Sequence, residues 1–228
     1  MSPDRFTRRG SLARLGSLVV AAAGGRALLD TGQADAGNKA VESGLVTCVL
    51  TPELTEGPYY IAGEKVRRDI REGHPGTLLT LHLRVLNVAT CGPIKGAAVD
   101  IWHCDAAGNY SGFGAGASSR TFLRGIQKTD ANGLAVFTTI YPGWYHGRTV
   151  HIHVKVHVGG AVVHTGQLFF SDTLTDKVYT ASPYNRRPNR DVRNAEDSIF
   201  VNGGKRGILA VTKAGSGYLG SIAMGVHR

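Results

Sequence analysis

Apolar and polar residues alternate one by one along several short stretches of this chain. Between Val150 and Val158 the valine and isoleucine side chains fall on one face, whereas His151, His153 and Lys155 fall on the other. A period of two residues predicts a β-strand with one apolar face. Comparable stretches predict further strands over residues 79–85, 97–104, 134–140, 162–170, 207–212 and 218–226.

Turn-forming residues separate the predicted strands. Asp130-Ala131-Asn132-Gly133 precedes one strand, Gly159-Gly160 joins two others, and Gly215-Ser216-Gly217 closes a hairpin near the C-terminus. Many short strands with glycine turns indicate a sandwich or a barrel. We expect an all-β protein with an antiparallel β-sandwich core, long irregular loops and little helix, apart from one short helix near Thr173–Tyr179.

The first 36 residues have the layout of an export signal. Arg8-Arg9 is followed by a weakly apolar run, and Ala34-Asp35-Ala36 fits a small-x-small cleavage site. We expect a cleaved twin-arginine signal peptide over 1–36, one domain over 37–228, and a periplasmic or extracellular protein. The run is short and interrupted for a transmembrane helix, so we expect no stable membrane insertion after cleavage, with a retained anchor as the alternative.

The chain is basic, with 26 Lys and Arg against 17 Asp and Glu and a net charge of +9. The densest basic group comprises Arg186, Arg187, Arg190 and Arg193. No nucleic-acid-binding motif accompanies it and aromatic residues are few. We therefore expect a solvated loop that attracts anionic molecules, and no nucleic-acid partner.

Three cysteines, Cys48, Cys91 and Cys104, allow three different pairings and leave one thiol over. An exported protein can keep a disulfide. Cys91 and Cys104 flank a predicted strand, which would hold them apart. The preferred pair is therefore Cys48 with Cys91, and Cys104 is expected to be a free, buried thiol.

The strand that begins at Val150 carries the candidate chemistry. His151 and His153 point to the same side, with Cα atoms roughly 6.6 Å apart. Two imidazoles at that spacing can converge on one metal ion with bonds of about 2 Å. A turn at Pro142-Gly143 precedes the strand and brings Tyr145 and Arg148 near it. A polar strand face with incidental histidines is the alternative for this pattern alone.

Phenolic oxygens complete the candidate metal ligands: Tyr110, Tyr145, His151 and His153. Zinc prefers histidine, cysteine and carboxylate, whereas magnesium and calcium prefer carboxylates, carbonyls and water. A hard, charge-dense Fe(III) ion suits phenolate oxygen. A tyrosine with a pKa near 10 needs such a cation to ionise at neutral pH. For Tyr110 alone, a surface tyrosine in a turn is the alternative.

An ordered set of motifs resembles the intradiol ring-cleavage dioxygenases, the non-haem Fe(III) family of the protocatechuate 3,4- and catechol 1,2-dioxygenases. The resemblance runs from about Thr51 to Phe170, with W-x7-Y and Y-x5-H-x-H spacings. The motifs are T-E-G-P-Y-Y (55–60), G-A-A-V-D-I-W-H-C-D-A-A-G-N-Y-S-G (96–112), T-D-A-N-G (129–133), T-I-Y-P-G-W-Y (139–145), G-R-T-V-H-I-H-V (147–154) and G-Q-L-F-F (166–170).

The resemblance implies a role for each matching residue. Tyr110 would be a permanent iron ligand and Tyr145 a ligand that leaves when substrate binds. His151 and His153 would be the histidine ligands, and Arg148 would stabilise developing negative charge. Gln167 would be a catalytic residue beside the bound ring. Trp102 and Tyr59 would line the substrate pocket. The alternatives are a core position for Trp102 and a strand-edge amide for Gln167.

The implied activity is cleavage of catechol-type diols by O2 between the two hydroxylated carbons, giving cis,cis-muconic acids and needing Fe(III) but no organic cofactor. The chain lacks the helical dimerisation segment of the catechol branch and is most similar to short secreted members. Its oligomeric state, monomer or homo-oligomer, stays open. One alternative is a non-catalytic secreted β-sandwich binding module. Another is a zinc hydrolase, which would need a carboxylate or a third histidine beside the histidine pair, with His103, His146 and His157 available.

Overall fold

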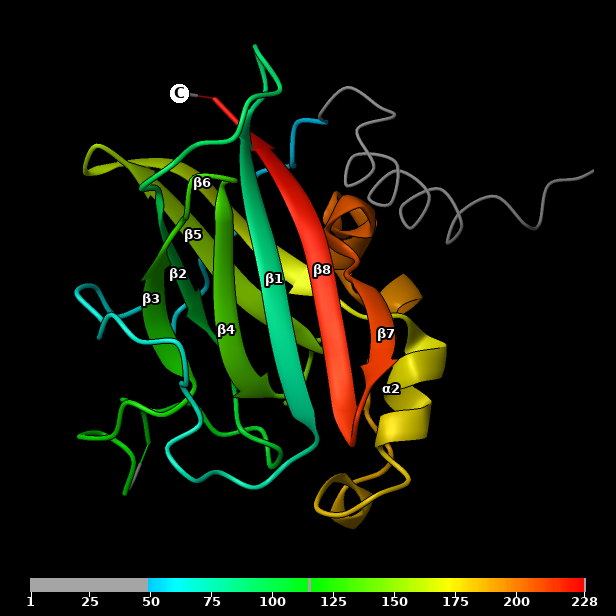
Figure 1. The fold of residues 1–228 in the computed structure, drawn as a ribbon. Coiled ribbons are helices and arrows are strands. Elements are labelled where there is room, and N and C mark those ends of the chain that lie inside the picture. The colour runs from blue at the N-terminus through cyan, green and yellow to red at the C-terminus, as the bar shows by residue number, and fades with distance from the viewer. Residues whose placement is uncertain (1–48, 115, 228) are drawn as a thin grey trace, which may run out of the picture.

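Eight strands form two four-stranded sheets that pack face to face (Figure 1). The computed structural model describes residues 49–114 and 116–227. The predicted signal peptide and Cys48 lie outside these residues. The strands are β1 (Leu78–Asn87), β2 (Ala98–Trp102), β3 (Arg124–Lys128), β4 (Leu134–Ile140), β5 (His151–Val158), β6 (Ala161–Phe169), β7 (Ala210–Ala214) and β8 (Gly217–Val226).

One sheet has the strand order β4-β1-β8-β7 and the other has the order β3-β2-β5-β6. All neighbouring strands are antiparallel except β1 and β8, which are parallel. Short helices follow β6 and lie beside β7, as Figure 1 shows for α2. The helices are α2 (Asp172–Val178), η1 (Tyr184–Arg186), η2 (Asn194–Glu196), α3 (Ser198–Val201) and η3 (Gly204–Gly207).

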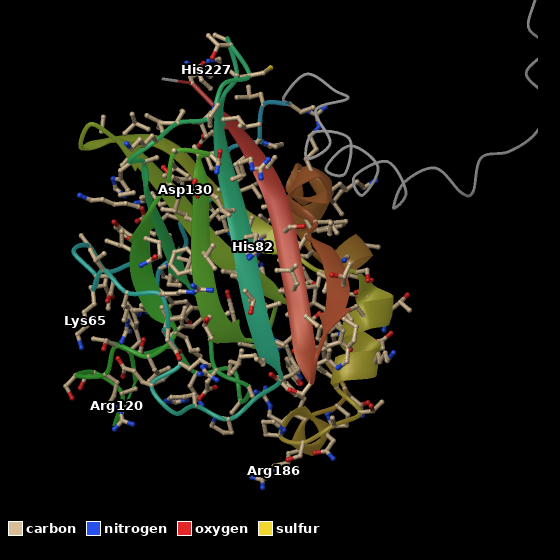
Figure 2. The ribbon with its side chains drawn as sticks, viewed as in Figure 1. Lys65, His82, Arg120, Asp130, Arg186 and His227 are labelled. Carbon is tan, nitrogen blue, oxygen red and sulfur yellow. The ribbon has the colours of Figure 1, made fainter. Side chains whose placement is uncertain are left out.

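The core lies between the sheets and follows from the alternation along the strands. On β1 the side chains of Leu79, Leu81 and Leu83 are fully buried against the other sheet. His82 faces outward from the same strand and lies on the front face in Figure 2. Strand β5 supplies Val154 and its apolar neighbours from the opposite side. The predicted all-β sandwich with little helix is confirmed.

The second sheet is buried on both faces, unlike the first. The first six residues of β5 are all buried, including the three polar side chains that point away from the core. Segments from the N-terminal side and from the loop after β2 cover this outer face; for example, Tyr60 packs on Trp102 with ring centroids 4.9 Å apart. The covered outer face is where the predicted site residues lie.

Strand β3 was missing from the sequence prediction. Its residues, R-G-I-Q-K, contain a single large apolar side chain and no alternation. It forms because it pairs with β2 along five registered residues at the sheet edge. Backbone hydrogen bonding, and not a hydrophobic pattern, therefore defines this strand.

The turn predictions hold where glycine is required. Gly159 and Gly160 link β5 to β6, and both have positive φ values, 61° and 89°. A two-residue hairpin turn of the type that matches strand twist needs positive φ at both positions, which glycine adopts without strain. Gly215 and Ser216 join β7 to β8, and in this turn only Gly215 has a positive φ, 54°. The predicted short helix is α2.

The basic loop is not simply solvated. The side chain of Arg190 is 3% exposed and binds Asp172 and Asp176, with nitrogen–oxygen distances of 2.5 and 2.8 Å. Arg193 also binds Asp176. Arg186 does project from the end of the molecule, as Figure 2 shows. The expectation of a solvated loop is therefore wrong for Arg190, because its guanidinium forms ion pairs with two aspartates of α2.

Two of the three cysteines lie in the described part of the chain. Cys91 is disulfide-bonded, and Cys104 is a free, buried thiol. The pairing with Cys48 stays a prediction because Cys48 lies outside the described residues.

Among residues 49–114 and 116–227, no helix is long and apolar enough to cross a membrane.

Leu81→Ala should lower the free energy of unfolding by about 2–5 kcal/mol, because it opens a cavity at a fully buried position of β1. Thr80→Ala, one residue away on the outward face, should cost about 1 kcal/mol or less. Urea unfolding of both variants measures the difference. Equal losses would contradict the assignment of the two faces.

Candidate metal centre

Two imidazoles meet on the buried outer face of β5. His151 and His153 are 2% and 1% exposed, and their Nε2 atoms lie 3.1 Å apart. His151 Nδ1 lies 2.6 Å from the carbonyl oxygen of Thr149, so its N–H donates there. This bond fixes the tautomer and leaves a lone pair on Nε2, the arrangement of a metal-binding histidine.

The loop between β4 and β5 brings Tyr145 to the same point. Gly143 makes this possible, because a Cβ atom there would lie 2.4 Å from the carbonyl oxygen of Asp105. The loop therefore packs tightly against the segment that follows β2. The hydroxyl oxygen of Tyr145 lies 3.1 Å from His151 Nε2.

Tyr110 reaches the site from that neighbouring segment. Its ring lies 5.6 Å from the Tyr145 ring and 6.3 Å from the His153 ring, measured between centroids. Its hydroxyl oxygen is buried and has no hydrogen-bond partner among the described residues. A buried hydroxyl without a partner is costly, and a bound cation would remove that cost.

Burial favours the neutral form of all four donors. Burial raises the pKa of Tyr110 well above its ordinary value and that of Tyr145 to about 12. Burial also lowers the pKa of His151 to about 3 and that of His153 well below its ordinary value. Neutral imidazoles are ready ligands, whereas the phenols need a nearby cation to lose their protons.

The donor set fits a trivalent iron ion. Two phenolic oxygens and two imidazole nitrogens converge, and the oxygens become anionic only next to a strongly charged cation. Residues 49–114 and 116–227 contain no group of three or more His, Cys, Asp and Glu that could hold a metal. The two tyrosines are therefore needed to complete the donor set. Zinc, calcium and magnesium sites are usually built without tyrosine ligands.

Arg148 and Gln167 lie against the imidazoles. The Arg148 guanidinium donates to the Gln167 side-chain oxygen at 2.6 Å, and one of its nitrogens lies 3.5 Å from His151 Nε2. Gln167 stands opposite His153 in the β5–β6 register, and its amide nitrogen donates to the carbonyl of Thr55. A fixed positive charge and a fixed amide thus border the donors.

Aromatic rings form the walls. Tyr59 stacks on Tyr110 with centroids 4.2 Å apart and meets Tyr145 edge-on at 5.9 Å. Trp102 stacks on His153 at 4.9 Å with an angle of 2° between the planes. All eight residues selected from the sequence therefore lie together in one site, and flat walls of this kind suit a planar aromatic ligand.

No pattern in the sequence indicates Arg124, which joins the segment of Tyr59 to the segment of Ser111. This side chain is 1% exposed, donates to the carbonyl oxygens of Tyr59 at 2.6 Å and Ser111 at 2.7 Å, and lies over the ring of Phe113. It begins β3, the strand that the sequence pattern did not predict. No local signal could have linked it to residues 65 positions away.

The additional histidines do not join the pair. His103 is buried with its ring nitrogens 2.8 Å from the carbonyl of Cys104 and 2.7 Å from the hydroxyl of Thr139. His146 is exposed and pairs with Asp191. His157 stands opposite Val162, near the β5–β6 turn. None of these three histidines therefore supplies the third ligand that a zinc hydrolase would need beside His151 and His153.

The structure is a two-sheet sandwich in which two phenols and two imidazoles converge on one covered outer face. Residues 55–187 match the family model described as Dioxygenase. Catechol 1,2-dioxygenase 1 of Acinetobacter lwoffii is 36% identical over 137 residues, which are 57% of this chain and 42% of the relative. Catechol 1,2-dioxygenase 2 of the same organism is 32% identical over 193 residues, 70% of this chain and 66% of the relative.

Solved structures give the same result. An intradiol ring-cleavage dioxygenase from Tetranychus urticae superposes with a TM-score of 0.75 at 38% identity, covering 79% of this chain and 95% of that chain. The dioxygenase domain of a dioxygenase and carbohydrate-binding protein fusion from Streptomyces sp. SirexAA-E has a TM-score of 0.62 at 31% identity, covering 78% and 99%.

The chain belongs to the intradiol ring-cleavage dioxygenase family, as the motifs predicted. This family uses non-haem iron, which is the ion that the donor set fits. The match spans less than two thirds of the length of the two curated A. lwoffii relatives.

A buried carboxyl group lies on the same outer face, two residues before Trp102. Asp100 is 1% exposed, and neither of its carboxyl oxygens has a hydrogen-bond partner among the described residues. Burial, reinforced by the negative charge of Glu64 and opposed by Arg124, raises the pKa of Asp100 to about 7. The folded protein therefore holds a proton here that the unfolded chain releases near pH 4.

Asp100→Asn should stabilise the protein more at pH 8 than at pH 5. Between about pH 4 and pH 7 the wild-type folded state keeps the extra proton, so its stability falls as pH rises, by up to about 1.4 kcal/mol per pH unit from this group. Asparagine has no charge to bury. Urea unfolding of both proteins at the two pH values measures the effect, and a pH-independent difference between them would contradict it.

Proposed function

We propose that this chain is an Fe(III) intradiol dioxygenase that cleaves catechol-type diols with O2 between the two hydroxylated carbons, giving cis,cis-muconic acids. The observation that carries the proposal is the convergence of Tyr110, Tyr145, His151 and His153 in a buried, aromatic-walled site next to Arg148. Family membership and the relatives named catechol 1,2-dioxygenase support the substrate class.

These four residues would hold the iron. When bound, Fe(III) supplies a Lewis acid that withdraws electron density from a diol and prepares its ring for reaction with O2. The two phenolates would offset part of its charge, and the two neutral imidazoles would add none.

The two tyrosines differ in how firmly they are held. Tyr110 is buried and stacked under Tyr59, whereas Tyr145 is only half-buried. A released Tyr145 oxygen is a strong base, because burial raises the pKa of its phenol to about 12. Tyr145 is therefore suited to take a proton from a diol hydroxyl at its phenolic oxygen, and Tyr110 is suited to stay in place.

Arg148 provides a positive charge where negative charge develops on the ring. Its guanidinium is held beside His151 and Gln167 before substrate arrives, so no reorganisation is needed during the reaction. The Gln167 amide, fixed by Thr55, can orient the ring edge. Tyr59 and Trp102 form flat walls that can align a planar ring.

The visible absorption spectrum of the iron-loaded protein tests the proposal. Wild-type protein should show a broad phenolate-to-Fe(III) charge-transfer band that moves to longer wavelength when catechol is added without oxygen. Tyr145→Phe should weaken the band and slow ring cleavage by at least about 100-fold, because it removes both a ligand and a base.

Tyr218→Phe is the matched control. It removes a phenol from β8, in the other sheet, and should leave the band and the rate unchanged. A protein that stays colourless after iron is added under oxidising conditions would overturn the dioxygenase proposal.

We also propose that the chain is exported through the twin-arginine route, with residues 1–36 removed. The support is the sequence pattern around Arg8-Arg9, which lies outside the described residues. In a Gram-negative host the full chain should reach the periplasm in a shortened form. Changing Arg8 and Arg9 to lysine should keep it inside the cell at full length, whereas Arg14→Lys should not. Periplasmic wild-type and double-variant protein in equal amounts would contradict this proposal.

A further inference from the structure

Asp197 lies beside the site and comes from a part of the chain that the sequence patterns did not connect with it. It stands between η2 and α3, beyond residue 187, where the family match ends. It is 2% exposed. One carboxylate oxygen accepts hydrogen bonds from Arg148 Nε at 2.8 Å and from the backbone nitrogen of Thr149 at 2.9 Å.

The other carboxylate oxygen caps a helix. It accepts from the backbone nitrogens of Ile199 at 2.8 Å and Phe200 at 3.2 Å, at the start of α3. A carboxylate can accept at both ends, whereas an amide can accept only at one. The residue thus joins the C-terminal segment to the loop that precedes β5.

Among the described residues, Asp197 is the one ionic partner of the Arg148 guanidinium. Its Nε edge binds Asp197, one terminal nitrogen binds Gln167, and the other lies near His151. Because the group is planar, fixing the Nε edge sets the direction of both terminal nitrogens. The Arg148 side chain is 16% exposed and the Asp197 side chain 1%, so removing either partner leaves a poorly solvated charge.

The same segment also supports the start of β5. The hydroxyl of Thr149 donates to the Asn194 side chain at 2.7 Å, and the Asn194 amide donates to the carbonyl of Phe170. The carbonyl of Thr149 in turn fixes the ring of His151. Asn194 and Asp197 therefore hold Arg148 and Thr149 through side-chain hydrogen bonds.

We propose that Asp197 is the positioning residue for Arg148: its carboxylate holds the guanidinium in the direction needed to face the reacting ring. The proposal rests on the proposed function for the role of Arg148. It does not depend on that function for the contact itself, so the two can fail separately.

Asp197→Ser separates positioning from helix capping. Serine is a good N-cap and should keep α3, but it is too short to reach Arg148. The side-chain Nε–H signal of Arg148 in the ¹H–¹⁵N spectrum of the metal-free protein gives a readout independent of activity. Its exchange with solvent should be slow in the wild type and should become at least about 10-fold faster in Asp197→Ser, since the buried bond is gone.

Asp176→Ser is the matched control. It also removes a carboxylate from a buried arginine, Arg190, in the same C-terminal segment, and it makes no contact with Arg148. It should leave the Arg148 signal and the activity unchanged. If Asp197→Ser does not fold, Asp197→Asn takes its place, because asparagine can cap α3 while presenting donors to Arg148.

A double-mutant cycle tests how Asp197 acts on the reaction. In the iron-loaded enzyme Asp197→Ser should lower kcat by about 10- to 100-fold and change KM by less than about 3-fold, with the charge-transfer band intact. In an Arg148→Ala background the same substitution should cost less than about 2-fold, because its target is already gone.

The outcomes are distinct. An unchanged Arg148 signal in Asp197→Ser, or equal losses of kcat in the two backgrounds, would overturn the positioning role. A wild-type protein that binds iron but cleaves no catechol would overturn the proposed function. In that case the Arg148 signal would still decide whether Asp197 holds the arginine.

Discussion

The central physical constraint in this protein is that polar side chains are buried on the outer face of a sheet. A sandwich needs only its inner faces covered, yet here loops also cover the outer face of β2 and β5. Buried polar groups must find partners. His151 finds one through Thr149, while the hydroxyl of Tyr110 finds none among the described residues. A bound cation would give that hydroxyl oxygen a partner.

Two arginines, the buried Arg124 and the partly buried Arg148, connect the loops that cover this face. Arg124 binds the backbone near Tyr59 and Ser111 and so joins the N-terminal segment to the loop that carries Tyr110. Arg148 binds Asp197 and so joins the C-terminal segment to the start of β5. The Arg124–Tyr59 bond joins residues 65 positions apart, and the Arg148–Asp197 bond joins residues 49 positions apart. The rigidity of the donors therefore depends on cross-links far from them in sequence.

Much of the site could be predicted because the positions of its residues follow from the alternation along strands and from turn residues close to them in sequence. Alternation placed His151 and His153 on one face, since side-chain direction in a strand depends only on position. Turn residues placed Tyr145 just before that strand. Strand β3, Arg124 and Asp197 could not be found in this way. Their positions depend on pairing and ion contacts between segments up to 65 residues apart, which no local period records.

Residue identity and short-range spacing were enough to predict every strand except β3, the turns, the donor types and the family. The fold of the whole chain was needed to show that the eight selected residues lie together on one outer face and that His103 has other partners. It also showed that the Arg190 side chain is buried and binds Asp172 of α2, whereas a solvated side chain was expected. The reason is physical: burial and ion pairing depend on which segments meet, and that is decided by packing of the whole chain.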